Sequence, residues 1–427
     1  MQEIIIGIIL LLLTLVGTPL FTVIAAIALI AFHAAGIDTA AIIVELFRLA
    51  DFPALIAIPL FAFAGHVLAE SKAPHRLMDL VQSIFGWMPG GMAVVAMCTA
   101  AVFTAFTGAS GVTIIALGGL LYPSLLKQGY PENFSLGLMT TSGSLGLLFP
   151  PSLPIILYAL VAKINLNTLF VAGILPGLLL LFVLAVYSIR VGMKSHVQRI
   201  PFSLANVWSS FKKAGWEVPL PLLVIGGIYG GAFTATEAAS VTALYAIVVE
   251  VFIRKEVSLF SGIPRIIRES MVLVGAILIM LGAAMGLTNY LIDQEIPGLV
   301  FDFLNRYVQN KFVFLLILNF IILNFTVIEV FSAIIVIVPI IIPIAAKYDI
   351  HPIHLGIMFL MNLEIGYMIP PLALNIFLAS ARFKKTLPQI YRAVLPFLFL
   401  LLIVLMLITY VPELSLFLTS FMKNQGG

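Results

Sequence analysis

The chain has 427 residues, of which 62% are hydrophobic and only 10% carry a charged side chain, and its formal net charge is +3. A soluble domain has about 25% charged residues because its surface must be wetted, so this composition excludes a soluble globular protein. The apolar runs leave room for on the order of ten membrane spans of about 20 residues each. The single cysteine, Cys98, excludes an internal disulfide.

The chain opens with an apolar stretch, residues 4–32, that is interrupted at Gly17-Thr18-Pro19. It lacks the basic start and the small-residue cleavage site of a secretory signal, so we expect it to be retained, as one long tilted helix or as two short ones. Residues 37–51 and 258–270 mix apolar and charged side chains too evenly for a span. Each is predicted to form an interfacial helix along the membrane surface; an ordinary solvent-facing helix is the alternative.

Two apolar segments of spanning length each contain a proline pair. The first reads TTSGSLGLLFPPSLPIILY with Pro150-Pro151, and the second reads LMNLEIGYMIPPLALNIFL with Pro370-Pro371. Proline removes a backbone donor and clashes with the carbonyl one turn back. In hydrocarbon, the freed backbone groups are tolerated only where protein or a water-filled cavity receives them. Each segment is therefore predicted to be a broken helix that lines a binding site.

The two proline pairs reveal an internal duplication. They are separated by 370 − 150 = 220 residues, and the same offset relates Gly146 to Gly366, Pro123 to Pro343 and Pro176 to Pro396. Basic residues indicate how the two copies are oriented. The loop after the first broken helix contains only Lys163, whereas its equivalent contains Arg382, Lys384, Lys385 and Arg392. This opposition predicts inverted repeats, with the loop at Lys163 outside the cell.

Another interrupted segment precedes each proline pair, at residues 92–126 and 312–346. The first has Thr107-Gly108-Ala109-Ser110-Gly111 at its centre, and the second has residues 324–329 there. Each arm has about 15 residues, roughly 22 Å of helix, which is short for a hydrocarbon core of about 30 Å. We therefore expect two re-entrant hairpins whose tips meet the broken helices near mid-membrane. Two kinked ordinary spans are the alternative.

Such meeting points would be rich in oxygen atoms. Carbonyl groups are exposed at hairpin tips and helix breaks, and hydroxyl groups come from Thr107, Ser110, Ser142 and Thr326. Neutral oxygens suit a sodium ion, while helix N-termini favour anionic groups. Glu329 and Glu364 are candidate functional carboxylates because acids inside membrane segments are costly; alternatively they face a polar cavity or pair with a neighbouring subunit. Asn375 is expected to bond the freed carbonyls of its own helix.

Other motifs argue against enzymatic chemistry. Thr234 and Glu237 have the spacing of a helix capping box, and the six histidines show no sustained metal-ligand spacing. The sequence has no glycine-rich phosphate loop ending in Lys-Ser or Lys-Thr, and no nucleophile–base arrangement. We therefore expect neither ATP hydrolysis nor another enzymatic activity.

Four motifs, in order, carry a family resemblance: FTGASG, GSLGLLFPPSLPIILY, GGAFTATEAASVTALYA and IPPLALNIFLASA. Over nearly the whole chain they resemble the large membrane subunit of tripartite ATP-independent periplasmic (TRAP) transporters. The resemblance implies an all-α, elevator-type, sodium-driven importer of organic acid anions, such as C4-dicarboxylates or sialic acid, in the bacterial inner membrane. It implies three partners, namely a small membrane subunit, a periplasmic substrate-binding protein and the lipid bilayer. It implies no nucleic acid and no cofactor other than sodium ions.

The resemblance also places the binding sites, with sodium ions between each hairpin tip and the facing broken helix. Carried onto this sequence, the first sodium site has Thr107, Ser110, Gly146 and Pro150, and the second has Phe325, Thr326, Gly366 and Ile369. Ser152 and Glu329 are the candidates for the substrate cavity. The second hairpin departs from the first because it lacks the Gly-Ala-Ser-Gly sequence of the first tip.

The expected organisation alternates scaffold and transport segments. The scaffold comprises 1–54 with the first interfacial helix, 169–270 with the second, and 389–427, and the transport cores comprise 55–168 and 271–388. One rival function is a stand-alone sodium/dicarboxylate carrier that needs no binding protein. Another is a non-transporting scaffold or an intramembrane enzyme, against which the paired broken helices argue.

Overall fold

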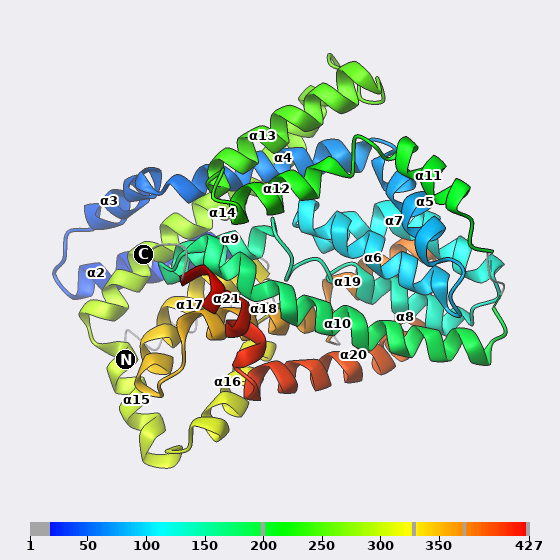
Figure 1. The fold of residues 1–427 in the computed structure, drawn as a ribbon. Coiled ribbons are helices and arrows are strands. Elements are labelled where there is room, and N and C mark those ends of the chain that lie inside the picture. Colours follow the sequence, from blue (N-terminus) through cyan, green and yellow to red (C-terminus); the bar gives the residue numbers. More distant parts are fainter. Residues whose placement is uncertain (1–17, 198–200, 327–329, 370–372, 424–427) are drawn as a thin grey trace.

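The computed structural model describes residues 18–197, 201–326, 330–369 and 373–423 (Figure 1). Every regular element within these ranges is a helix, which confirms the predicted all-α, multi-pass membrane architecture. Six of the described helical segments are long and apolar enough to cross a membrane. They are Pro53–Glu70, Ser110–Lys127, Leu166–Lys194, Ala235–Ile253, Gly262–Asp293 and Leu387–Tyr410.

The first half of the chain contains the elements up to α11. They are α2 (Leu20–Ala34), α3 (Ala40–Arg48), the short 3-10 helices η1 (Leu49–Asp51) and η2 (Pro53–Ile56), α4 (Ala57–Glu70), α5 (Ala73–Phe85), α6 (Gly91–Thr107), α7 (Ser110–Lys127), α8 (Glu132–Ser142), α9 (Leu153–Ala162), α10 (Leu166–Lys194) and α11 (Leu204–Lys213). Helix α2 begins directly after Pro19, which fits the preference of proline for helix starts. Residues 4–17 lie outside the described residues, so the choice between one and two helices there stays a prediction.

The second half contains the elements from α12 onward. They are α12 (Pro219–Tyr229), α13 (Ala235–Ile247), the π-helical turn η3 (Val248–Ile253), α14 (Gly262–Asp293), α15 (Ile296–Tyr307), α16 (Lys311–Thr326), α17 (Val330–Lys347), α18 (Pro352–Gly366), α19 (Leu374–Phe383), α20 (Leu387–Tyr410) and α21 (Glu413–Lys423). Helix α14 runs unbroken for 32 residues. Residues 262–270 are therefore the first turns of a long helix, whereas α3 is separated from α4 by the 3-10 helices around Pro53.

The helix bounds follow the 220-residue offset of the sequence. Helices α7 and α17 both have 18 residues, and they begin and end 330 − 110 = 347 − 127 = 220 residues apart. The helices on either side of them, α6 with α16 and α8 with α18, also begin 220 residues apart. The same elements therefore recur in the same order in the two halves.

The packing between the halves is reciprocal. Helix α7 packs on α19 while α17 packs on α9, and α8 packs on α20 while α18 packs on α10. Figure 1 also shows the equivalent helices α10 and α20 running side by side, and the two are in contact. Such reciprocal contacts are what a two-fold relation between equivalent parts produces. Inversion of the copies across the membrane stays a prediction.

Two polar features hold the ends of helices in place. The predicted capping box is confirmed, because the Glu237 backbone N–H donates to the Thr234 hydroxyl and the Thr234 N–H donates to a Glu237 carboxylate oxygen 2.8 Å away. At the start of α5, the partly buried Arg76 guanidinium donates to Glu217 and Glu256 at 2.6 Å each. It also faces the fully buried Glu250 at 3.4 Å. This cluster ties the α4–α5 connection to the segments that flank α12 and η3.

Candidate functional site where the first hairpin meets the broken helices

The first hairpin turns tightly, and its turn is buried. Only Gly108 and Ala109 separate α6 from α7, and Gly108 has a left-handed backbone (φ +64°) that favours glycine. A Cβ atom at Gly108 would also meet the Leu153 side chain, at 2.4 Å. On the other side, the Gly65 backbone of α4 lies against the backbone of Thr107. The turn is therefore enclosed by α4 and by the start of α9. One arm, Ser110–Lys127, is long enough to cross a membrane, so a re-entrant course stays a prediction.

The first proline-containing segment is broken as its sequence predicts. Helix α8 ends at Ser142 and α9 begins at Leu153, with turns and bends between them. The backbone of the break packs closely against the backbone of α6 at Gly146. A Cβ atom at this position would lie 2.3 Å from the Ala101 carbonyl oxygen and 2.4 Å from the Ala105 nitrogen. Only glycine fits at this approach of two backbones.

A hydroxyl group joins the same two segments. The Thr104 hydroxyl on α6 donates to the Gly143 carbonyl oxygen at 3.0 Å and lies 2.7 Å from the Thr113 hydroxyl of α7. The break, α6 and α7 are thereby held together by polar contacts as well as by packing. All five residues carried over to the first copy lie on this unit and are buried: Thr107, Ser110, Gly146, Pro150 and Ser152.

Several oxygen atoms around this unit lack a partner in the described structure. The buried hydroxyl groups without a hydrogen-bond partner include those of Thr107, Thr141, Ser142 and Ser152. Buried polar groups in proteins are nearly always hydrogen-bonded, and leaving one unpaired costs about 1–3 kcal/mol. A group of such oxygens beside a helix break is therefore the pattern of a site that a cation or polar ligand completes.

The second copy is described only in part. Helix α18 ends at Gly366, which is buried, and α19 begins at Leu374, so this segment is broken as well. Ile369 is partly buried in the break. Phe325 and Thr326 are the last two residues of α16, and their side chains lie outside the description. Glu329, the second substrate-cavity candidate, also lies outside the described residues.

Asn375 connects the two copies. Its side-chain carbonyl accepts a hydrogen bond of 2.8 Å from the Ser110 hydroxyl, and its amide donates to the Thr140 carbonyl oxygen at 3.3 Å. Both of these contacts lie outside its own helix; the carbonyls of residues 370–372, which the expectation also concerns, are not among the described residues. The Asn375 backbone N–H donates to the Tyr367 carbonyl oxygen at 3.2 Å. No sequence pattern indicates this contact, because Ser110 and Asn375 are 265 residues apart.

The other polar groups of the second copy are buried in α18. The Asn362 amide donates to the Asn319 side chain at 2.8 Å, and Asn319 donates to the Thr409 hydroxyl at 2.8 Å, which links α18, α16 and α20. Glu364 is fully buried, and its carboxyl group faces the backbone of Leu148 in the first break. The candidate carboxylate of the second copy therefore adjoins the break of the first.

His351 and His354 serve the fold in the described structure. The His351 ring accepts from the Ile353 N–H at the start of α18. The buried His354 ring lies 3.3 Å from both the Ser415 hydroxyl and the Thr409 carbonyl oxygen. Within the described ranges no group of three or more His, Cys, Asp or Glu side chains is placed to hold a metal ion.

Together these features define a class of protein: a multi-pass helical membrane protein with a buried polar site at its broken helices, as secondary transporters have. Comparison with known families is consistent with that class. Residues 6–414 match the family model described as "Tripartite ATP-independent periplasmic transporter, DctM component". The chain belongs to this family, the large membrane subunits of TRAP transporters, as the four sequence motifs predict.

Large permease proteins of several TRAP transporters are similar to this chain over most of its length. The C4-dicarboxylate TRAP transporter large permease protein DctM of Pseudomonas aeruginosa is 34% identical over 383 residues and covers 89% of each chain. The sialic acid TRAP transporter large permease protein SiaM of Vibrio cholerae is 30% identical and covers 87% of each chain. The ectoine TRAP transporter large permease protein TeaC of Halomonas elongata is 29% identical. The family thus includes members with chemically different substrates.

A solved structure supports the fold. The crystal structure of the Alcanivorax borkumensis YdaH transporter, titled for its unusual topology, aligns with a TM-score of 0.59 at 15% sequence identity. The alignment covers 90% of this chain and 88% of that one. At this identity the likeness concerns the arrangement of helices and not the substrate.

Proposed function

We propose that this chain is the subunit through which a TRAP transporter imports an organic acid anion across the bacterial inner membrane, driven by sodium. A periplasmic binding protein delivers the anion, and a small membrane subunit completes the complex. The observation that carries the proposal is the group of unpartnered buried oxygens where the first hairpin tip meets the first break. Membership of the family supplies the partners and the direction of transport.

The sodium ion of the first site is assigned to the hairpin tip and the break. Thr107 contributes a hydroxyl oxygen with no other partner. Ser110 uses its only hydroxyl proton toward Asn375, which leaves its oxygen lone pairs free for a cation. Gly146 and Pro150 supply backbone oxygens of the break. By the same offset, the equivalent positions Phe325, Thr326, Gly366 and Ile369 form the second site.

The anion is assigned to the start of α9. Ser152 is the residue at the N-terminal cap of this ten-residue helix, it is fully buried, and its hydroxyl has no partner in the described structure. A helix N-terminus favours negative charge, since its first N–H groups point outward unpaired. A carboxylate at this position would accept from both the backbone and the Ser152 hydroxyl. Glu329 is the candidate from the second hairpin.

Transport is proposed to follow the elevator scheme, in which the hairpins and broken helices move as one body against a scaffold. The Ser110–Asn375–Thr140 contacts support this scheme, because they join the first hairpin and both broken helices directly. Helices joined by these contacts can move across the membrane together, so that the binding site between them keeps its shape during the movement. The residue ranges expected for the scaffold and transport segments are part of this proposal.

The test is uptake by proteoliposomes that contain the large and small subunits, with the binding protein outside. The panel is succinate, sialic acid and ectoine, each with a sodium gradient or with potassium on both sides. We expect uptake of at least one carboxylate, and only with sodium. Equal uptake in potassium would contradict the sodium coupling, and undiminished uptake without the binding protein would favour the stand-alone carrier.

A matched pair of variants locates the first sodium site. Thr107→Val removes the unpartnered hydroxyl at nearly constant volume, whereas Thr107→Ser keeps it. We expect the sodium concentration for half-maximal uptake to rise at least about tenfold in Thr107→Val, which corresponds to about 1.4 kcal/mol, and to change little in Thr107→Ser. An unchanged sodium dependence in both variants would remove this side chain from the site.

A further inference from the structure

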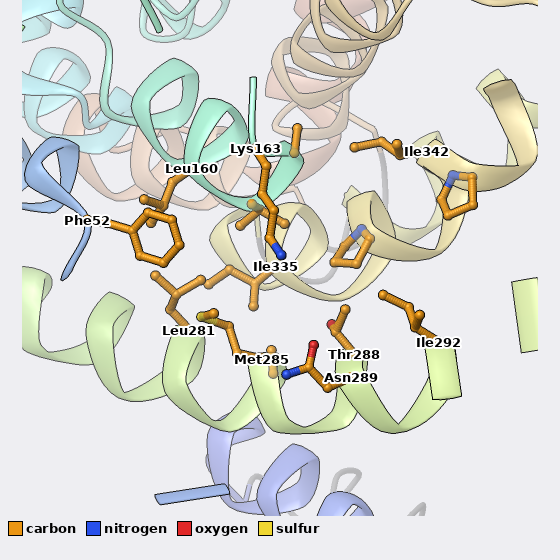
Figure 2. A pocket seen from close by; sticks show the side chains of 15 residues that line it. Phe52, Leu160, Lys163, Leu281, Met285, Thr288, Asn289, Ile292, Ile335 and Ile342 are labelled. Atoms are coloured by element: carbon orange, nitrogen blue, oxygen red, sulfur yellow. The ribbon is translucent and has the colours of Figure 1, made fainter. Parts of the chain in front are cut away.

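A cavity of about 180 Å³ lies between α9, α14 and α17 and is open on one side (Figure 2). Its volume is below the range of about 300–1,000 Å³ that is usual for drug-sized ligands, so it suits only a small solute. The walls are mainly apolar and include Phe52, Met285 and Pro339. The polar lining comprises Lys163, Thr288 and Asn289, and none of the described residues that line the cavity is acidic. The cavity therefore combines one positive charge with apolar walls.

Lys163 supplies that charge. It caps the C-terminus of α9 in a left-handed backbone conformation (φ 53°), which is uncommon for a residue with a side chain. Figure 2 shows its side chain extending into the cavity toward α14, where Thr288 and Asn289 lie. Within the described residues its ammonium group has no carboxylate within ion-pair distance. By contrast, Lys347 at the end of α17 lies over the Phe301 ring, 4.5 Å from its centroid.

The cavity lies at the far end of the helix that begins at the proposed substrate site. Helix α9 runs from Ser152 at its N-terminal cap to Lys163 at its C-terminal cap, and ten helical residues extend over about 15 Å. The positive-inside pattern places Lys163 on the outer side of the membrane. A solute that enters from outside would therefore meet Lys163 before it reaches the break.

We propose that this cavity is a second anion-binding site, an outer vestibule in which Lys163 holds the carboxylate of the organic acid before it moves along α9 to Ser152. The inference rests on the proposed function and adds a recognition step to it. The Asn289 amide and the Thr288 hydroxyl can donate to the second carboxylate or to hydroxyl groups of the solute. Lys163 is exposed to solvent, so an ion pair formed here is screened by water and the anion is held only weakly.

The test counts bound anions on the intact complex of large and small subunits in nanodiscs, without the binding protein. Equilibrium dialysis with radiolabelled succinate is expected to give two equivalents per large subunit in sodium. Lys163→Gln is expected to give one equivalent, and Lys163→Arg two. Lys127→Gln is the matched control, because it removes the same charge at the end of α7, outside the cavity. One equivalent in the wild type and in Lys163→Gln alike would overturn the vestibule.

Uptake separates this inference from the proposed function. Uptake from subsaturating succinate-loaded binding protein is expected to fall about tenfold or more in Lys163→Gln and to stay normal in Lys127→Gln. If the wild type takes up no carboxylate, the proposed function fails; if it does and Lys163→Gln is unimpaired, only the vestibule fails.

A lipid headgroup is the competing anion. Loss of bound anionic lipid from Lys163→Gln with unchanged succinate binding would make the cavity a lipid site and overturn the proposal.

Discussion

The two broken helices share one backbone plan but differ in how their polar groups are used. Around the first break, buried hydroxyl groups such as those of Thr107 and Ser152 have no partner in the described structure. In α18, before the second break, the Asn362 amide group donates to Asn319, while the Asn362 side-chain carbonyl and both Glu364 carboxylate oxygens have no partner in the described structure. Asn375 of the second copy also forms a hydrogen bond with Ser110 of the first hairpin. The equivalent position in the first copy, 375 − 220 = 155, is the apolar Ile155.

Unpartnered buried oxygens occur in both copies, with Asn362 and Glu364 in the second. Under the proposed function the first break lies in the first sodium site, whereas the Asn362–Asn319–Thr409 chain links helices. A change at the first break should therefore abolish transport, whereas a change in the hydrogen-bond chain of the second copy should mainly lower stability. Three tests, taken from the largest expected effect to the smallest, examine that distinction.

Gly146→Ala should have the largest effect, because the new methyl group would overlap the backbone of α6 at Ala101 and Ala105. Overpacking typically costs about 1–3 kcal/mol, and here neither neighbouring backbone can rotate away as a side chain could. We expect transport to be lost and the thermal unfolding temperature of the purified complex to fall.

The control for that variant is Gly275→Ala in α14, where the added Cβ meets no atom within 4 Å. This control should keep full transport and unfold at or above the wild-type temperature, since alanine favours a helix over glycine. Normal transport by Gly146→Ala would show that the break does not need its close approach to α6.

The Ser110–Asn375 contact should show an intermediate effect that depends on both partners. Ser110→Ala and Asn375→Ala each break a hydrogen bond between membrane helices, which contributes about 0.6 kcal/mol on average and at most about 1.7 kcal/mol, and Asn375→Ala also removes the bond to Thr140. The double variant should cost less than the sum of the two, and a double-mutant cycle on unfolding free energies measures that difference. Combining Ser110→Ala with Thr409→Val provides the control, because these residues belong to separate hydrogen-bond networks. Additivity in the first cycle would mean that the contact does not couple the copies.

Thr409→Val should have the smallest effect. It removes the hydroxyl that accepts from Asn319, and hydrogen bonds between membrane helices contribute about 0.6 kcal/mol on average and at most about 1.7 kcal/mol. We expect a small drop in unfolding temperature, normal sodium dependence, and full recovery in Thr409→Ser. A change in sodium dependence would place the chain of hydrogen bonds in the transport site and weaken the distinction between the copies.

Local features of the fold could be predicted from the sequence because their causes are local. The proline pairs predict the two breaks, the Thr234–Glu237 spacing predicts the capping box, and the 220-residue offset predicts equal helix bounds. The oxygen-rich first tip could also be predicted, since its hydroxyl and glycine residues are adjacent in the chain.

Features that depend on distant segments could not be predicted. The bond from Ser110 to Asn375 and the approach of α4 to the hairpin tip at Gly65 arise only when helices far apart in sequence pack together. The cavity at Lys163 is likewise formed by three separate helices. A single lysine in a loop carries no sign of the apolar walls that surround it.

The reciprocal packing of the halves has a consequence for how the chain could be divided. Helix α7 is covered by α19 and α9 by α17, so much of the apolar surface of one half is buried by the other. Neither half would be expected to fold alone, yet two polypeptides cut in the α10–α12 connection should reassemble into a working subunit when co-expressed. The contacts between the halves resemble those of two subunits that happen to be joined in one chain.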